Sequence, residues 1–209
     1  SLAEYASRIK TDQKAIYYIV GDDEATLKNS PLLEMYNEKE IEVLIMDQDI
    51  DEFVIPTINK YKEHDLKSVN FSDAAEALKT DEDKKEETNI KPLLKKMKKV
   101  LGEQVKDVTA SSRLKDSPSC IVADSNDPTA KMQELMKAMG QPGQQDIKPI
   151  LEINPSHAII IKLKNMKKSK SFDDISQLLL DQAVLLEGAK LKNPTDFVDR
   201  LNTILTESL

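Results

Sequence analysis

The stretch of residues 171–209 limits the possible folds most, because it predicts two helices joined by one tight turn. Ser171, with an acidic residue three positions later, is a helix start signal, and Gly188 suits a left-handed helix end. Asn193 then caps a second helix that Pro194 opens. The first helix is apolar on most of its sides, whereas the second has a single apolar stripe. The first helix should therefore pack against more than one neighbour.

Such a terminal hairpin cannot stand alone, because burial of its own side chains does not offset the entropy lost when it becomes ordered. Either preceding segments or another copy of the chain must cover part of its apolar surface. The pattern favours a second copy, since two such hairpins can form an isologous four-helix interface, as in many symmetric dimers. An ordinary core hairpin in a monomer is the alternative.

The first third of the chain alternates between strand and helix patterns. Apolar runs rich in β-branched residues predict strands at residues 15–20, 41–46 and 66–71. Helical patterns cover residues 1–9, 22–39 and 51–61. Strands that alternate with helices pair in parallel through right-handed crossovers. We therefore predict a small three-layer α/β subdomain with a parallel sheet.

Residues 80–88 are charged or polar throughout, which predicts a linker between an α/β part at residues 1–79 and a second domain at residues 89–209. The second domain opens with a basic amphipathic helix at residues 89–101. This pattern is more typical of a core-packed helix with a solvated lysine face than of a helix that binds a membrane or an acidic partner. Strand patterns at 105–109, 119–123 and 151–153 and a helix at 157–168 follow. The predicted fold class of the chain is α+β.

Charge and composition exclude several classes of function. The 209 residues carry a formal net charge of −7, which argues against nucleic acid as the main partner, because phosphate binding requires a clustered basic surface. The one cysteine, Cys120, permits no intrachain disulfide and fits a reducing compartment. The sequence contains neither an apolar run of membrane-spanning length nor a signal peptide. The chain begins without Met, inside a helical pattern, so we expect it to start partway through a longer protein.

The sequence contains no catalytic, cofactor or metal motif. His64 and His157 lie in no metal-binding spacing, and one cysteine cannot build a structural zinc site. Gly21 follows the first strand but precedes three acidic residues that would repel phosphate, and the glycine-bearing stretch at 140–145 predicts a loop. Cys120 activated by His157 would make a small thiol-dependent hydrolase or transferase. The position of Cys120 at the start of an apolar strand favours an inert buried thiol instead.

A helical pattern around residue 135 carries methionines along one face. Met132, Leu135, Met136 and Met139 recur at i, i+3, i+4 and i+7. Methionine is flexible and polarizable, so such a stripe can adapt to varied partners. An ordinary core stripe has the same spacing, and the pattern alone favours that interpretation.

A set of short strings runs collinearly along nearly the whole chain. The most specific is Leu-Glu-Ile-Asn-Pro-Ser-His at residues 151–157. The others include Ser1-Leu-Ala-Glu-Tyr-Ala-Ser-Arg, Ile16-Tyr-Tyr-Ile, Ile41-Glu-Val-Leu, Asp51-Glu-Phe, Val105-Lys-Asp-Val, Arg113-Leu, Ser117-Pro, Cys120-Ile-Val, Gln182-Ala and Asn193-Pro. Together these strings resemble the ninety-kilodalton heat-shock chaperones, especially their bacterial HtpG type.

The resemblance implies a fragment of a longer chaperone, namely the end of its middle domain up to about residue 79 and then its C-terminal dimerisation domain. In that family ATP and Mg²⁺ bind in an N-terminal domain upstream of the matched part. This chain should then neither bind nor hydrolyse ATP, although the full-length protein is expected to be an ATPase. The family also implies a cytoplasmic homodimer that binds client proteins, and neither nucleic acid nor a membrane. The chain ends without the acidic tail of eukaryotic cytosolic members, which favours a bacterial origin.

The resemblance also implies which residues bind clients and which form the dimer interface. The family exposes an amphipathic helix of the C-terminal domain to clients and uses an aromatic residue after Asp-Glu in the middle domain. The candidate client-binding residues are Phe53, Met132, Leu135, Met136 and Met139. The family dimerises through its terminal helices, and the candidate interface residues are Ile175, Leu178, Leu179, Ala183, Leu186, Phe197, Leu201, Ile204 and Leu205. Pro56 departs from the family pattern, in which polar residues occur near this position.

Overall fold

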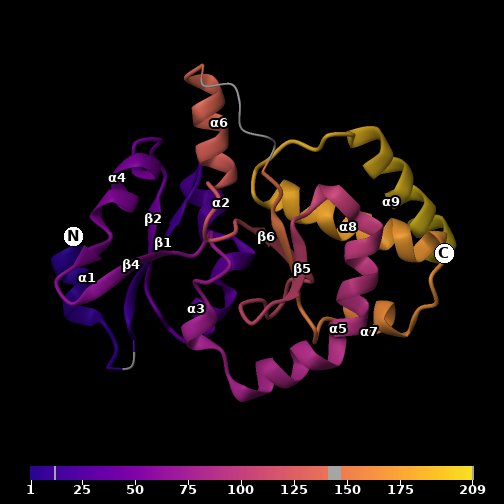
Figure 1. Ribbon diagram of the computed structural model, residues 1–209, viewed down its shortest axis with the longest axis horizontal. Coiled ribbons are helices and arrows are strands. Elements are labelled where there is room, and N and C mark those ends of the chain that lie inside the picture. Colours follow the sequence, from indigo (N-terminus) through magenta and orange to yellow (C-terminus); the bar gives the residue numbers. More distant parts are fainter. Residues whose placement is uncertain (12, 141–146, 209) are drawn as a thin grey trace. The chain divides into compact units, whose positions relative to one another are not determined.

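Strand β1 (Ala15–Val20) is buried along its whole length and lies inside a four-stranded sheet (Figure 1). This computed structural model describes residues 1–11, 13–140 and 147–208. The loop predicted at 140–145 therefore lies almost wholly outside the described residues. Two compact units are present, which we call unit 1 (residues 1–79 and 122–147) and unit 2 (residues 80–121 and 148–209).

The sheet of unit 1 has the strand order β2-β1-β4-β3. β2 (Val43–Met46) and β4 (His64–Ser68) both pair with β1 in parallel, as the alternating pattern predicts. β3 (Lys60–Tyr61) pairs with β4 antiparallel, which the sequence analysis missed because two residues have no readable period. The parallel α/β arrangement of this part is confirmed.

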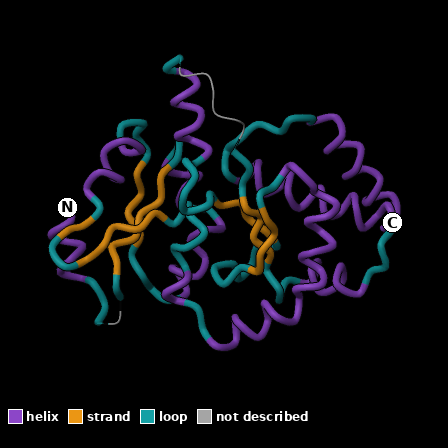
Figure 2. Tube along the Cα trace, viewed as in Figure 1, coloured by secondary structure: helices purple, strands orange, loops and turns teal. Residues whose placement is uncertain are grey.

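Short helices precede, connect and follow these strands (Figure 2). They are α1 (Leu2–Arg8), α2 (Glu24–Lys28), the 3₁₀ turn η1 (Pro31–Leu33), α3 (Glu34–Glu38), α4 (Asp51–Ile58) and the 3₁₀ turn η2 (Glu76–Leu78). α4 ends earlier than predicted because Asn59 has a positive φ of 51° and turns the chain into β3. One further helix, α6 (Ala130–Ala138), belongs to unit 1 although it comes from much later in the chain.

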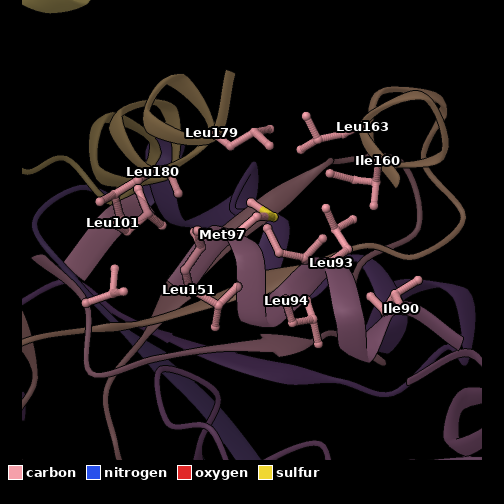
Figure 3. Close-up of a cluster of buried hydrophobic side chains, with 14 of the residues drawn as sticks. Ile90, Leu93, Leu94, Met97, Leu101, Leu151, Ile160, Leu163, Leu179 and Leu180 are labelled. Carbon is pink, nitrogen blue, oxygen red and sulfur yellow. The ribbon is translucent and has the colours of Figure 1, made fainter. Parts of the chain in front are cut away.

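Unit 2 is built on a three-stranded sheet with the order β5-β7-β6. β5 (Asp107–Ala110) pairs in parallel with β7 (Ile150–Ile153), and β6 is Ser119–Val122. The helices are α5 (Asp81–Leu101), the 3₁₀ turn η3 (Gly102–Gln104), α7 (Ala158–Asn165), α8 (Lys170–Leu186) and α9 (Pro194–Ser208). Met97 lies in the middle of the apolar core with Leu93, Leu151 and Leu179 around it (Figure 3).

α5 begins at Asp81, so the residues predicted as a linker form its first two turns. Thr80 accepts a hydrogen bond from the Asp83 N–H, and the Asp83 side chain binds the Thr80 N–H in return, which completes a capping box. Acidic residues in a first turn are also favoured by the helix dipole. An exposed helix needs no apolar residues in its first turns, so a charged stretch can also be helical. Unit 1 still gives way to unit 2 between residues 79 and 80.

The terminal hairpin has the predicted form with one different cap. Ser169 caps α8, since its Oγ accepts the Phe172 N–H at 3.2 Å, whereas Ser171 was the predicted cap. Ser171 instead donates from its hydroxyl to Glu207 at 3.1 Å. Gly188 is left-handed with φ of 76°, and α9 begins at Pro194, both as predicted.

Candidate functional site

α4 turns apolar side chains outward. Phe53, the aromatic residue predicted to bind clients, is half-buried. Ile50, immediately before the helix, and Val54 within it are 61% and 43% exposed. α4 buries Glu52 and Ile55, at 4% and 8% exposed, while Ile50 and Val54 face solvent. Apolar side chains left in solvent beside a buried glutamate indicate an interaction surface.

α6 carries the methionine stripe and is not a core helix. None of its nine residues, all of which the structure describes, is buried. Met132, Leu135 and Met136 are half-buried, and Met139, which follows the helix, is 58% exposed. The core interpretation that the spacing favoured is therefore wrong for this helix.

The first turn of α6 is attached to unit 1 by polar contacts. Thr129 caps the helix by accepting the Met132 N–H at 3.0 Å, and its hydroxyl donates to the Glu52 carboxylate at 3.0 Å. Lys131 forms ion pairs with Asp22 and with Asp49, the latter at 2.9 Å. Burial raises the pKa of Glu52, while the Thr129 hydrogen bond and the Lys131 charge act in the opposite direction.

The predicted dimer residues fall into three groups, which are buried, exposed and half-buried. Leu178, Leu179 and Ala183 are 7%, 2% and 0% exposed within the single chain, so they are already covered. Leu186 and Leu205 are 47% and 50% exposed. Ile175, Phe197, Leu201 and Ile204 are half-buried. The sequence analysis left out two further exposed apolar residues of the hairpin, Leu185 and Val198, at 46% and 47%.

Arg200 holds the two helices of the hairpin together. Its guanidinium lies 3.7 Å from Asp174 and 3.5 Å from Asp181 on α8, and 3.8 Å from Asp196 on its own helix. Burial raises the pKa of Asp181, an effect that the charge of Arg200 opposes. The exposed leucines are thus carried on two helices that the charge of Arg200 bridges.

A family model described as Hsp90 protein matches residues 1–209 of the chain. The chain belongs to the Hsp90 family. It is 50% identical to the chaperone protein HtpG of Treponema denticola and 47% identical to that of Treponema pallidum. These matches cover 99% and 98% of this chain but 33% of each relative. The HtpG of a Sulfurovum species is 46% identical over 100% of the chain and 34% of the relative. The chain therefore spans about a third of the length of these chaperones.

Unit 1 of this Hsp90 family chain does not fit a nucleotide at its strand ends. Asp22 follows β1 and is paired with Lys131, and Asp23 caps α2. These carboxylates would repel phosphate, so we assign no nucleotide step to this edge of the sheet. Among the described residues no group of three metal-binding side chains occurs, and no helix is long and apolar enough to cross a membrane.

The two residues of the thiol hypothesis have separate structural contacts. Cys120 is 2% exposed, and its Sγ lies 4.0 Å from a carboxylate oxygen of Glu152. The Nδ1 of His157 accepts the Ile159 N–H at 3.2 Å and caps α7. Glu152 also binds the fully buried Arg113 through Nε at 3.0 Å, which no periodicity could have indicated. In this Hsp90 family chain the surroundings of Cys120 are those of a packed core.

Proposed function

We propose that this chain is the part of an HtpG-type chaperone that dimerises and offers a binding surface to unfolded or partly folded client proteins. The observation that carries the proposal is α6, a helix with a continuous apolar stripe and no buried residue. Phe53, Met132, Leu135, Met136 and Met139 form the client contacts. Clients of this kind expose irregular apolar segments, and flexible methionine side chains can adapt to many of them.

The dimer interface in this proposal lies on α8 and α9. Leu178, Leu179 and Ala183 support α8 from inside, while Leu186 and Leu205 and the half-buried Ile175, Phe197, Leu201 and Ile204 meet the second copy. The exposed Leu185 and Val198 extend the same apolar area. Two copies would present two client surfaces, so that a client held by both dissociates more slowly than from one.

In this proposal ATP binding and hydrolysis belong to other parts of the full-length chaperone. ATP and Mg²⁺ bind and react in N-terminal parts of the full-length chaperone that the matched third does not include, and this chain has no catalytic role. Its place of action is the cytoplasm. The thiol-dependent alternative has no support from the position of Cys120, which is buried.

Client binding can be tested with a fluorescent, reduced and carboxymethylated protein that cannot refold. We expect Met136→Asp to weaken its binding at least tenfold, because a charge placed in the apolar stripe must be desolvated on binding. Ala138→Asp adds the same charge to the same helix at an exposed position off the stripe and serves as the control. Equal affinities of the two variants would contradict the proposed surface.

Dimerisation can be tested by sedimentation equilibrium over a dilution series. Deleting α8 and α9 is a poor test, because Leu179 and Ala183 belong to the core of the single chain. We instead expect the double variant Leu186→Asp, Leu205→Asp to sediment as a monomer at concentrations where the parent chain is dimeric. Asn202→Asp, an exposed position on α9, should leave the dimer intact. A parent chain that is monomeric at micromolar concentration would refute this interface.

A further inference from the structure

The position of α6 depends on a small group of polar side chains, since none of its own residues is buried. We call Glu52, Thr129, Lys131, Asp22 and Asp49 the α6 clasp. Figure 1 shows α6 projecting beyond the sheet of unit 1. A helix held in this way can move if its polar contacts are lost, without disturbing an apolar core.

Thr129 is the central member of the clasp because its one hydroxyl makes two contacts at once. The oxygen accepts the Met132 N–H at 3.0 Å, and the hydrogen is donated to Glu52, whose two carboxylate oxygens lie 3.0 and 3.2 Å away. Thr129 and Glu52 are 9% and 4% exposed, so water does not easily replace either contact. The hydroxyl therefore couples the start of α6 directly to α4.

Lys131, two residues further along the same first turn, adds a second attachment. Its ammonium group meets Asp49, which precedes α4, at 2.9 Å, and also Asp22, which follows β1. The Lys131 side chain is 18% exposed, whereas Asp22 and Asp49 are 59% and 69% exposed, so solvent screens these ion pairs and the buried Thr129–Glu52 contact is the stronger attachment. One cation thus joins three separate segments of unit 1.

The clasp residues lie next to the proposed client contacts in sequence. Glu52 precedes Phe53 on α4, and Lys131 precedes Met132 on α6. Any rotation of α6 about its first turn would therefore change the spacing between Phe53 and the methionine stripe. We propose that the α6 clasp consists of positioning residues, which hold the apolar stripe of α6 at a fixed distance from Phe53 and so set the affinity for clients. This inference rests on the proposed client-binding function.

Its test measures helix position and client binding separately. Spin labels are placed at Thr57→Cys on α4 and Ala138→Cys on α6, both exposed positions, while the buried Cys120 stays in place. The label-to-label distance distribution is measured by pulsed electron resonance. We expect the double variant Thr129→Val, Lys131→Met to broaden this distribution and to weaken client binding at least fivefold.

Two controls separate positioning from general damage to the fold. Thr129→Ser keeps the hydroxyl, so this single variant should retain the narrow distance distribution and the client affinity of the parent chain. Thr80→Val removes the equivalent cap of α5 and should change neither. An unchanged distribution in the double variant would overturn the inference. So would a broadened distribution with full client affinity, provided that Met136→Asp abolishes binding; if Met136→Asp also binds normally, the proposed function itself fails.

Discussion

Helices α5 and α6 have the same kind of sequence and different surroundings. Each begins at a capping threonine and carries a stripe of leucine and methionine with lysines on other faces. α5 buries five residues, Ile90, Leu93, Leu94, Met97 and Leu101, whereas α6 buries none. Periodicity therefore identifies which face of a helix is apolar, but it does not reveal what covers that face.

The difference comes from the segments that pack on each helix. α5 packs against β5, α7 and α8, and together these elements enclose one core. α6 is joined to its unit by the side chains at its first turn. An apolar face that the chain itself leaves uncovered is available to another protein.

Truncating one methionine in each helix should give the largest contrast. Met97 is fully buried, so Met97→Ala should lower the free energy of unfolding by about 2–5 kcal/mol through lost burial and the cavity left behind. Met136→Ala should cost less than about 1 kcal/mol, because Met136 is only half-buried. Urea denaturation of the two variants measures both values. Equal losses would mean that α6 is a core helix after all.

A change of pH should change the stability of unit 2, the unit that contains α5, because of the carboxyl group of Glu187. Burial raises the pKa of Glu187 from 4.5 to about 7, against the opposing charge of Arg113. The folded state then holds a proton that the unfolded state has released, so stability falls as pH rises from about 4.5 to about 7. The expected loss is about 3 kcal/mol. Glu187→Gln should remove this pH dependence of stability in thermal melts. If the variant kept the pH profile of the parent chain, Glu187 would not be its source.

The capping threonines of α5 and α6 allow the stability contribution of the same residue type to be compared in the two helices. Thr80→Val removes an exposed cap from α5 and should cost about 1 kcal/mol. Thr129→Val removes a cap from α6 and also leaves the buried Glu52 carboxylate without its hydroxyl donor, so about 1–3 kcal/mol is expected. Unfolding curves of the two variants, each compared with its serine counterpart, measure the difference. A smaller loss at Thr129 than at Thr80 would contradict a buried clasp.

Much of the fold could be predicted because local signals agreed with one another. The buried strand β1, the left-handed Gly188 and the start of α9 at Pro194 all follow from short patterns. The clasp could not be predicted, since Glu52 and Thr129 are 77 positions apart and a buried glutamate has no distinctive sequence pattern. The cap at Ser169 was missed because Ser171 has the stronger start signal, an aspartate three positions later, whereas Ser169 has Phe172 at that spacing.

Substitutions of the α5 lysines should change stability least. They also test whether the outer face of this helix binds a partner. Lys96 is exposed, so Lys96→Met should change stability by less than about 0.5 kcal/mol. Lys98 donates to the carbonyl oxygens of Gly102 at 2.6 Å and Val105 at 3.0 Å, so Lys98→Met should cost about 1 kcal/mol. Denaturation measures both, and vesicles of anionic lipid test the alternative that this face binds a charged surface. Vesicle binding that Lys96→Met weakens would show that α5 binds a charged surface in addition to packing in the core.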